Sequence, residues 1–200
     1  MTKAASLESL VSQLLKTAET IEVAARALEA ALAPSVGAVV AVGEALYPLL
    51  NRPKEGPLGP LREWEGGLPS LELEFPLGEG PLSAELWVEK GRGPLLFRSA
   101  LTVHVKKRRR LVKLGGAKRK DGGVEAEEVY VDRPSEPEEA PSFVQGAAAL
   151  LALAEDLEKV LREAALAALS KRYAPLLAAK REEAWKALEA LAVLEAAAEV

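Results

Sequence analysis

LELEFPLGEGPLSAELWVEKGRGPLLFRSALTVHV, residues 71–105, is the stretch that decides the fold. Its first segment sets Leu71, Leu73 and Phe75 against Glu72 and Glu74. The alternation continues through two segments whose apolar positions are Leu82, Ala84, Leu86 and Val88, then Leu95, Phe97, Leu101, Val103 and Val105. Glycine and proline separate the segments. Period-two alternation between such turns predicts an antiparallel meander with one buried face, and Val124–Val131 predicts a last strand.

The segment before the meander carries a heptad pattern. Leu7, Leu14, Ile21 and Leu28 recur every seven residues, with Leu10, Thr17, Ala24 and Ala31 at the intervening positions. This predicts a helix over about residues 6–33 with one apolar stripe. Pro34 is expected to stop it and Ser35 to cap a second helix over residues 36–50. The stripe favours packing within the chain's own domain, with an intermolecular coiled coil as the alternative.

The segments after the meander predict two more helices. Residues 134–141 are acidic and contain prolines, which indicates a linker. Ser142 is expected to cap a long helix that Pro175 kinks or ends, before a final helix over about residues 176–198. The apolar positions of the first of these helices are Leu150, Leu153, Leu157, Val160, Leu161, Ala164, Ala168 and Leu169, and those of the last are Trp185, Leu188, Leu191, Ala192 and Leu194.

These elements predict an α+β fold, with helices from both ends of the chain packed around or beside a central antiparallel meander. The expected parts are N-terminal helices in residues 1–50, a Pro/Gly-rich connection in 51–69, the sheet in 70–133, the linker in 134–141 and C-terminal helices in 142–200. Trp64 is expected to pin the connection to the body. Two hundred residues, 49% of them hydrophobic, suffice for one compact unit.

Basic residues are concentrated in one short stretch. Nine of the 26 Lys and Arg residues lie between Lys106 and Lys120, and removing these and Asp121 from the totals leaves 17 bases against 29 acids elsewhere. Such segregation creates a local field that attracts polyanions. Glycine pairs at 115–116 and 122–123 predict a projecting β-ribbon with a mobile tip. The candidate phosphate contacts are Lys106, Lys107, Arg108, Arg109, Arg110, Lys113, Lys118, Arg119 and Lys120.

A second interpretation of the basic stretch is that the protein neutralises it internally. Acidic residues on the expected partner strand could pair with it across the sheet; these are Glu125, Glu127, Glu128 and Asp132. Cations on a projecting edge also discourage aggregation without binding anything. The sequence has no zinc-ligand pattern, aromatic-interleaved sheet motif or KH-type loop to support nucleic-acid binding.

Other candidate chemistry is weaker. His104, the only histidine, has no recognisable nucleophile partner and is expected on a strand surface. Glu72 with Glu74, and Glu125 with Glu127, could bind a hard cation but are also typical of a solvated strand face. The segment LGGAKRK, residues 114–120, lacks the ending of a P-loop, and the absence of cysteine excludes thiol catalysis and disulfides. No cofactor or metal is expected.

The sequence thus favours a non-enzymatic protein that contacts DNA or RNA phosphates through a basic ribbon. The alternative is a structural, assembly or adaptor protein that binds a protein partner, or itself, through its heptad-patterned helices. No membrane partner is expected, because residues 36–50 are too short and too interrupted to cross a bilayer, and the expected location is the cytoplasm. Few Asn, Gln and Met residues with many charges are typical of thermophile proteins.

Overall fold

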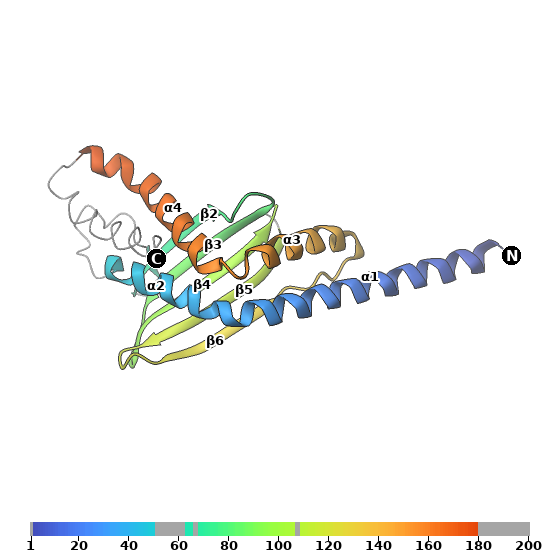
Figure 1. Cartoon of the computed structure of the whole chain (residues 1–200), viewed down its shortest axis with the longest axis horizontal. Helices are drawn as coiled ribbons and strands as arrows, with labels where there is room; N and C mark the ends of the chain where they lie inside the picture. The colour runs from blue at the N-terminus through green and yellow to red at the C-terminus, as the bar shows by residue number, and fades with distance from the viewer. Residues whose placement is uncertain (1, 51–62, 66–67, 107–108, 180–200) are drawn as a thin grey trace.

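The computed structural model describes residues 2–50, 63–65, 68–106 and 109–179. Six antiparallel strands form one sheet in chain order, and the helices pack on one of its faces (Figure 1). The predicted α+β class is confirmed. The strands are β1 Glu63–Glu65, β2 Leu68–Pro76, β3 Leu82–Lys90, β4 Leu95–Val105, β5 Arg109–Arg119 and β6 Val124–Val131; the helices are α1 Thr2–Leu32, α2 Val36–Leu50, α3 Ala140–Leu153 and α4 Leu157–Ala179.

The sheet buries the face that its alternation predicts. Every apolar position of β2, β3 and β4 identified from the sequence is buried, whereas the intervening residues are half-buried or exposed, apart from Ser99, which is buried on the helix-covered face. The register sets Leu71 opposite Val88 and Leu86 opposite Leu101, so these side chains extend one apolar layer across neighbouring strands. A fold with one covered sheet face follows from this pattern.

Helix α2 occupies the centre of the covered face. It contacts β3, β4 and β5, and its buried residues include Val39, Leu46 and Leu50. Helix α4 covers β2, while α3 contacts both α1 and the strands β3, β4 and β5, and α1 also contacts β6. In Figure 1, α1 leaves this cluster and extends well beyond the sheet toward the N-terminus. Only part of α1 therefore takes part in the core.

Two glycines allow helices to approach the sheet closely. A Cβ on Gly43 of α2 would lie 2.7 Å from Cβ of Ser99, and one on Gly146 of α3 would lie 2.0 Å from Cγ2 of Val105. Both separations are shorter than side chains tolerate. The Ser99 hydroxyl donates a hydrogen bond to the Val39 carbonyl at 3.2 Å, which ties β4 to α2 at the same approach.

The N-terminal and connecting elements differ from their predictions in two places. Residues Ala33–Ser35 form a 3₁₀ turn, and the Ser35 hydroxyl donates to the Ala154 carbonyl at 3.5 Å, a long-range bond that the capping prediction did not include. The Pro/Gly-rich connection contains strand β1, in which Trp64 pairs with Pro69, so this part is not irregular. Residues 51–62 and 66–67 of the connection lie outside the described residues.

The C-terminal helices also depart from prediction. Helix α3 begins at Ala140, so Ser142 lies inside it and the expected capping role is wrong. The predicted single helix is interrupted at residues 154–156, where the Ala154 and Asp156 amides donate to carbonyls three residues earlier. Helix α4 continues through Pro175 to Ala179, so Pro175 does not end it. Most of the predicted final helix, residues 180–198, lies outside the described residues.

The helical run Ser9–Leu50 is long and apolar enough, by length and composition alone, to cross a membrane. Half of its most apolar window is buried inside the protein, a property also found in core helices that never meet lipid. The expectation that no segment crosses a membrane was based on residues 36–50 alone, and this longer run was not included. The absence of a membrane partner therefore stays a prediction.

Candidate functional site

Strand β5, which carries most of the basic stretch, does not form a projecting ribbon with β6 in the described part of the chain. It pairs with β4 along one side and with β6 along the other. Leu111, Val112, Leu114 and Ala117 are buried, and a Cβ on Gly116 would lie 2.7 Å from Val40 of α2. The apolar half of this strand is therefore part of the core, which is why the ribbon prediction is wrong.

Seven of the nine predicted phosphate contacts lie among the described residues, and six of these form two groups at opposite ends of the sheet. Lys106, in a left-handed conformation with φ of 52°, Arg109 and Arg110 lie at one end, and Lys118, Arg119 and Lys120 lie at the other. Lys113 lies between them on β5. The eight steps from Arg110 to Lys118 span roughly 26 Å at strand spacing. Lys107 and Arg108 lie outside the described residues.

The Arg109 side chain lies on the helix-covered side of the sheet, where other residues of the protein bind it. Its guanidinium forms an ion pair with Glu139 and donates a hydrogen bond to the Asp132 carbonyl at 3.1 Å. It also lies 5.9 Å from the ring centroid of Phe143 on α3. Only 15% of the side chain is exposed, so Arg109 joins the start of α3 to the sheet and is poorly placed to meet a polyanion.

Three more of the nine cations have carboxylate partners. Arg110 contacts Asp132 at 3.2 Å and lies over Tyr130, with 5.5 Å to the ring centroid. Lys118 contacts Glu44 of α2 at 3.4 Å. Arg119 contacts Asp121 at 2.8 Å and Glu125 at 3.5 Å. Internal neutralisation, proposed through the partner strand, is thus found at Glu125 and Asp132, but Glu44 and Glu139 contribute from elements remote in sequence.

The turn between β5 and β6 is held by its own carboxylate. Asp121 accepts a hydrogen bond from the Gly123 amide at 2.9 Å, and this bond, assisted by Arg119, lowers the pKa of Asp121 below its usual value. The Arg119 guanidinium therefore helps to hold the turn between β5 and β6. Among the described residues, Lys106, Lys113 and Lys120 are the predicted contacts for which no carboxylate partner is found.

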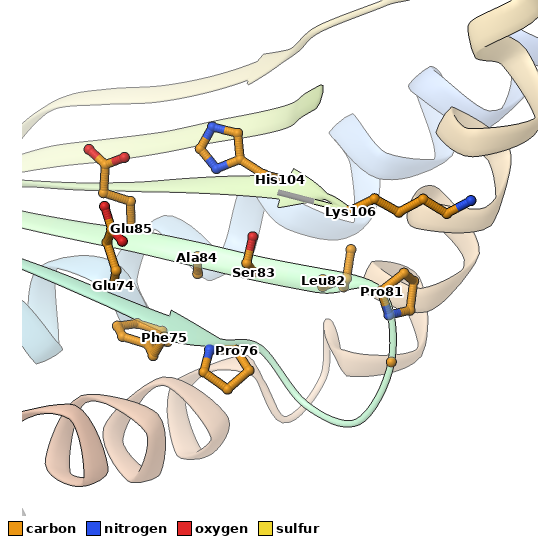
Figure 2. A pocket seen from close by; sticks show the side chains of 11 residues that line it. Glu74, Phe75, Pro76, Pro81, Leu82, Ser83, Ala84, Glu85, His104 and Lys106 are labelled. Carbon is orange, nitrogen blue, oxygen red and sulfur yellow. The ribbon is translucent and has the colours of Figure 1, made fainter. Parts of the chain in front are cut away.

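The uncovered face of the sheet has a shallow depression beside β2, β3 and β4. Figure 2 shows Glu74, Glu85 and His104 on these three strands, with Lys106 at the end of β4. Glu72, Glu74 and Glu85 bring carboxylate oxygens within 4.8 Å of one another. Sequence analysis identified Glu72 with Glu74, and the register of β2 with β3 adds Glu85. Exposed carboxylates of this kind are common on a solvated strand face.

The apolar stripe of α1 changes character along the helix. Ala25, Leu28 and Leu32 are fully buried against the body. Toward the N-terminus the apolar side chains are about half to two-thirds exposed: Leu7 66%, Leu10 56%, Val11 48%, Leu14 50% and Leu15 66%. We call these five residues the distal stripe. The heptad pattern predicted the stripe apart from Leu15, but its division into a buried and an exposed half was not predicted.

A polar clamp fixes α1 where it leaves the body. Arg133, just after β6, contacts Glu22 and Glu29 of α1, each at 3.0 Å. Hydrogen bonds from Arg133 and Arg26 lower the pKa of Glu22, and the two carboxylates raise the pKa of Arg133. The distal stripe therefore extends from a helix whose base is anchored by both packing and charge.

Comparison with known proteins adds no relative. No family model, curated protein or solved structure matches this chain.

Proposed function

We propose that this chain is a non-enzymatic, cytoplasmic assembly or adaptor protein that binds an amphipathic helix through the distal stripe of α1. The observation that carries the proposal is the division of one heptad pattern: Leu28 and Leu32 are fully buried, whereas Leu10 and Leu14 are half exposed. The pattern is continuous in sequence, so the exposed half has the chemistry of a helix-packing surface.

The geometry supports a binding role for the exposed half. A helix segment without tertiary partners is only marginally stable in water, since propensity alone contributes little. Contiguous exposed apolar side chains frequently mark interaction sites, and an apolar helix face is a common recognition surface for another helix. Covering Leu7, Leu10 and Leu14 would both order the projecting segment and remove apolar area from water.

The test is the native size of the protein in gentle extracts of cells that produce it. The wild-type chain should elute as a complex larger than its own 21.3 kDa. Leu10→Glu with Leu14→Glu should shift the chain to its monomer position, because burying a carboxylate in an apolar seam is costly. Ser12→Glu, in the same segment but off the stripe, is the matched control and should leave the complex intact. Monomer elution of the wild-type chain from an extract loaded at concentrations well above micromolar would contradict the proposal.

A second candidate function, contact with nucleic acid, is supported by a smaller set of cations. Lys106, Lys113 and Lys120 have no carboxylate partner among the described residues, and Lys113 sits directly opposite Tyr130, whose side chain is 47% exposed. An exposed ring beside cations on an uncovered sheet suits a single strand, whose bases stack on aromatic side chains. Four of the nine original candidates are engaged in ion pairs, so this candidate ranks second.

Fluorescence anisotropy with labelled single- and double-stranded DNA and RNA tests this second candidate. Three phosphate contacts would give a slope of about −2 in log K against log salt concentration for a single strand, and about −3 for a duplex. Replacing Lys106, Lys113 and Lys120 with Gln should abolish the binding, whereas Lys16→Gln on α1 should not. Absence of binding at low salt would eliminate nucleic acid as a partner of the sheet.

A further inference from the structure

We propose that the distal stripe binds a second copy of this chain, so that two α1 helices pair antiparallel in a homodimer. This inference rests on the proposed function, because it names the partner helix. Four features of the described residues favour a second copy as the partner: the face of α1 that the body occupies, the heptad register, the position of the charges and the extent of exposed apolar surface.

The body of the protein excludes a parallel pair. The stripe that is exposed at Leu7 and Leu14 continues along the same helix face to Leu28, where α1 packs against α3. A parallel partner helix following the stripe would therefore meet α3 from about Ile21 onward. An antiparallel partner instead ends near that point and places its own body beyond the N-terminus of the first α1, where Figure 1 shows the helix standing clear of the sheet.

The heptad positions give a symmetric antiparallel register. Leu10 of one copy lies opposite Leu14 of the other, and Leu7 lies opposite Thr17, so each copy contributes the same layers. The Thr17 hydroxyl donates to the Gln13 carbonyl of its own helix at 2.9 Å. Because that hydroxyl is already satisfied, the Thr17 methyl group can face the seam without leaving a polar group unpaired.

The charges of α1 allow like helices to meet. The positions that flank the seam are uncharged: Val11, Gln13, Ala18 and Thr20. Lys16 and Glu19 lie on other faces of the helix, and the one charged seam position, Lys3, lies at the end of the seam opposite Ile21 in this register. Charged flanking positions are the usual means by which coiled coils reject an identical partner, and this segment has none.

The size of the exposed surface predicts a reversible dimer. Nineteen residues from Thr2 to Thr20, just before the half-buried Ile21 and Glu22, form about 28 Å of projecting helix at 1.5 Å per residue. This is less than three heptads, so the interface is at the small end of specific protein interfaces. We expect a dissociation constant on the order of micromolar, and dimer formation that depends on protein concentration.

Light scattering of the purified full chain over a concentration series tests the stoichiometry. The mass should rise from 21.3 kDa toward twice that value. Leu10→Glu with Leu14→Glu should remain monomeric throughout, and Ser12→Glu should dimerise like the wild type. All three proteins should give the same circular dichroism at concentrations where the wild type is monomeric. A purified monomer whose extract still shows a stripe-dependent complex would overturn the homodimer but keep the proposed function. Monomers in both experiments would overturn both.

Disulfide trapping tests the orientation, because the natural chain has no cysteine. Chains carrying Leu10→Cys and chains carrying Leu14→Cys, distinguished by tag size, should crosslink to each other efficiently when mixed. Each variant alone should crosslink poorly. Efficient crosslinking within each single variant would indicate a parallel pair and overturn the proposal. A wild-type monomer that floats with phospholipid vesicles would also overturn it and assign the stripe to lipid.

Discussion

Gly146 shows how one missing side chain positions a helix. It lets α3 lie against Val105 of β4 at a distance that no Cβ could share. Gly37 on α2, by contrast, is exposed, and a Cβ there would meet nothing within 4 Å. The two helical glycines are indistinguishable in the sequence, because the difference lies in which surface faces each of them.

Substitution of these two glycines should therefore have opposite effects. Gly146→Ala should lower the free energy of unfolding by about 1–2 kcal/mol, since overpacking by about 1–3 kcal/mol exceeds a helix-propensity gain of up to about 1 kcal/mol. Gly37→Ala should raise it by up to about 1 kcal/mol. Urea denaturation measures both values. Equal effects of the two substitutions would contradict the close approach of α3.

The Glu22–Arg133 clamp should make the anchoring of α1 sensitive to acid. Because hydrogen bonds from Arg133 and Arg26 lower the pKa of Glu22 in the folded protein, its contribution is present above the ordinary value of 4.5 and is lost as pH falls through the lowered pKa. Glu22→Gln should thus be less stable than wild type at pH 7, and the difference should vanish at low pH. Urea denaturation at several pH values measures this, with Glu19→Gln as control; a difference independent of pH would refute the clamp.

At the scale of elements, the strands of the meander were the most predictable. Val124–Val131 was predicted with the bounds that the structure shows, and the apolar positions of β2, β3 and β4 are all buried. A strand with one covered face needs apolar and polar side chains in alternation, and this pattern can be read from a few neighbouring residues. The interruption between α3 and α4 was not predictable in this way, because it serves tertiary placement: α3 packs beside α1, while α4 covers β2.

The prediction of a projecting ribbon in the basic stretch was wrong for a related reason. Its charges are local in sequence, but their environments are set by remote residues such as Glu44 and Glu139. The alternation of Val112 and Leu114 about Lys113 within the stretch was the available signal that β5 belongs to the core. Charge density alone overestimated how much of the stretch reaches solvent.

The two halves of α1 should respond differently to truncation of a leucine. Leu28→Ala removes a fully buried side chain and should lower the free energy of unfolding by about 2–5 kcal/mol. Leu14→Ala removes a half-exposed one and should cost less than about 1 kcal/mol when measured at concentrations where the protein is monomeric. Chemical denaturation compares them. A large loss for Leu14→Ala in the monomer would show that the distal stripe is part of the fold.

At the scale of the whole molecule, one heptad pattern has two roles. Its C-terminal half completes the core of a one-sided sheet, and we assign its N-terminal half to association. This division explains why a protein with a well-packed body retains exposed leucines on a projecting helix. A measurement of association therefore tests the proposed function most directly.

Hydrogen–deuterium exchange of the α1 amides tests the division of α1 into a core half and an association half most directly. The protein concentration should range from about 1 µM to about 1 mM, because this range includes the expected micromolar dissociation constant. We expect residues 21–32 to be protected at every concentration, and residues 7–17 to gain protection only as concentration rises. Residues 7–17 protected equally at all concentrations, or never protected, would contradict the account.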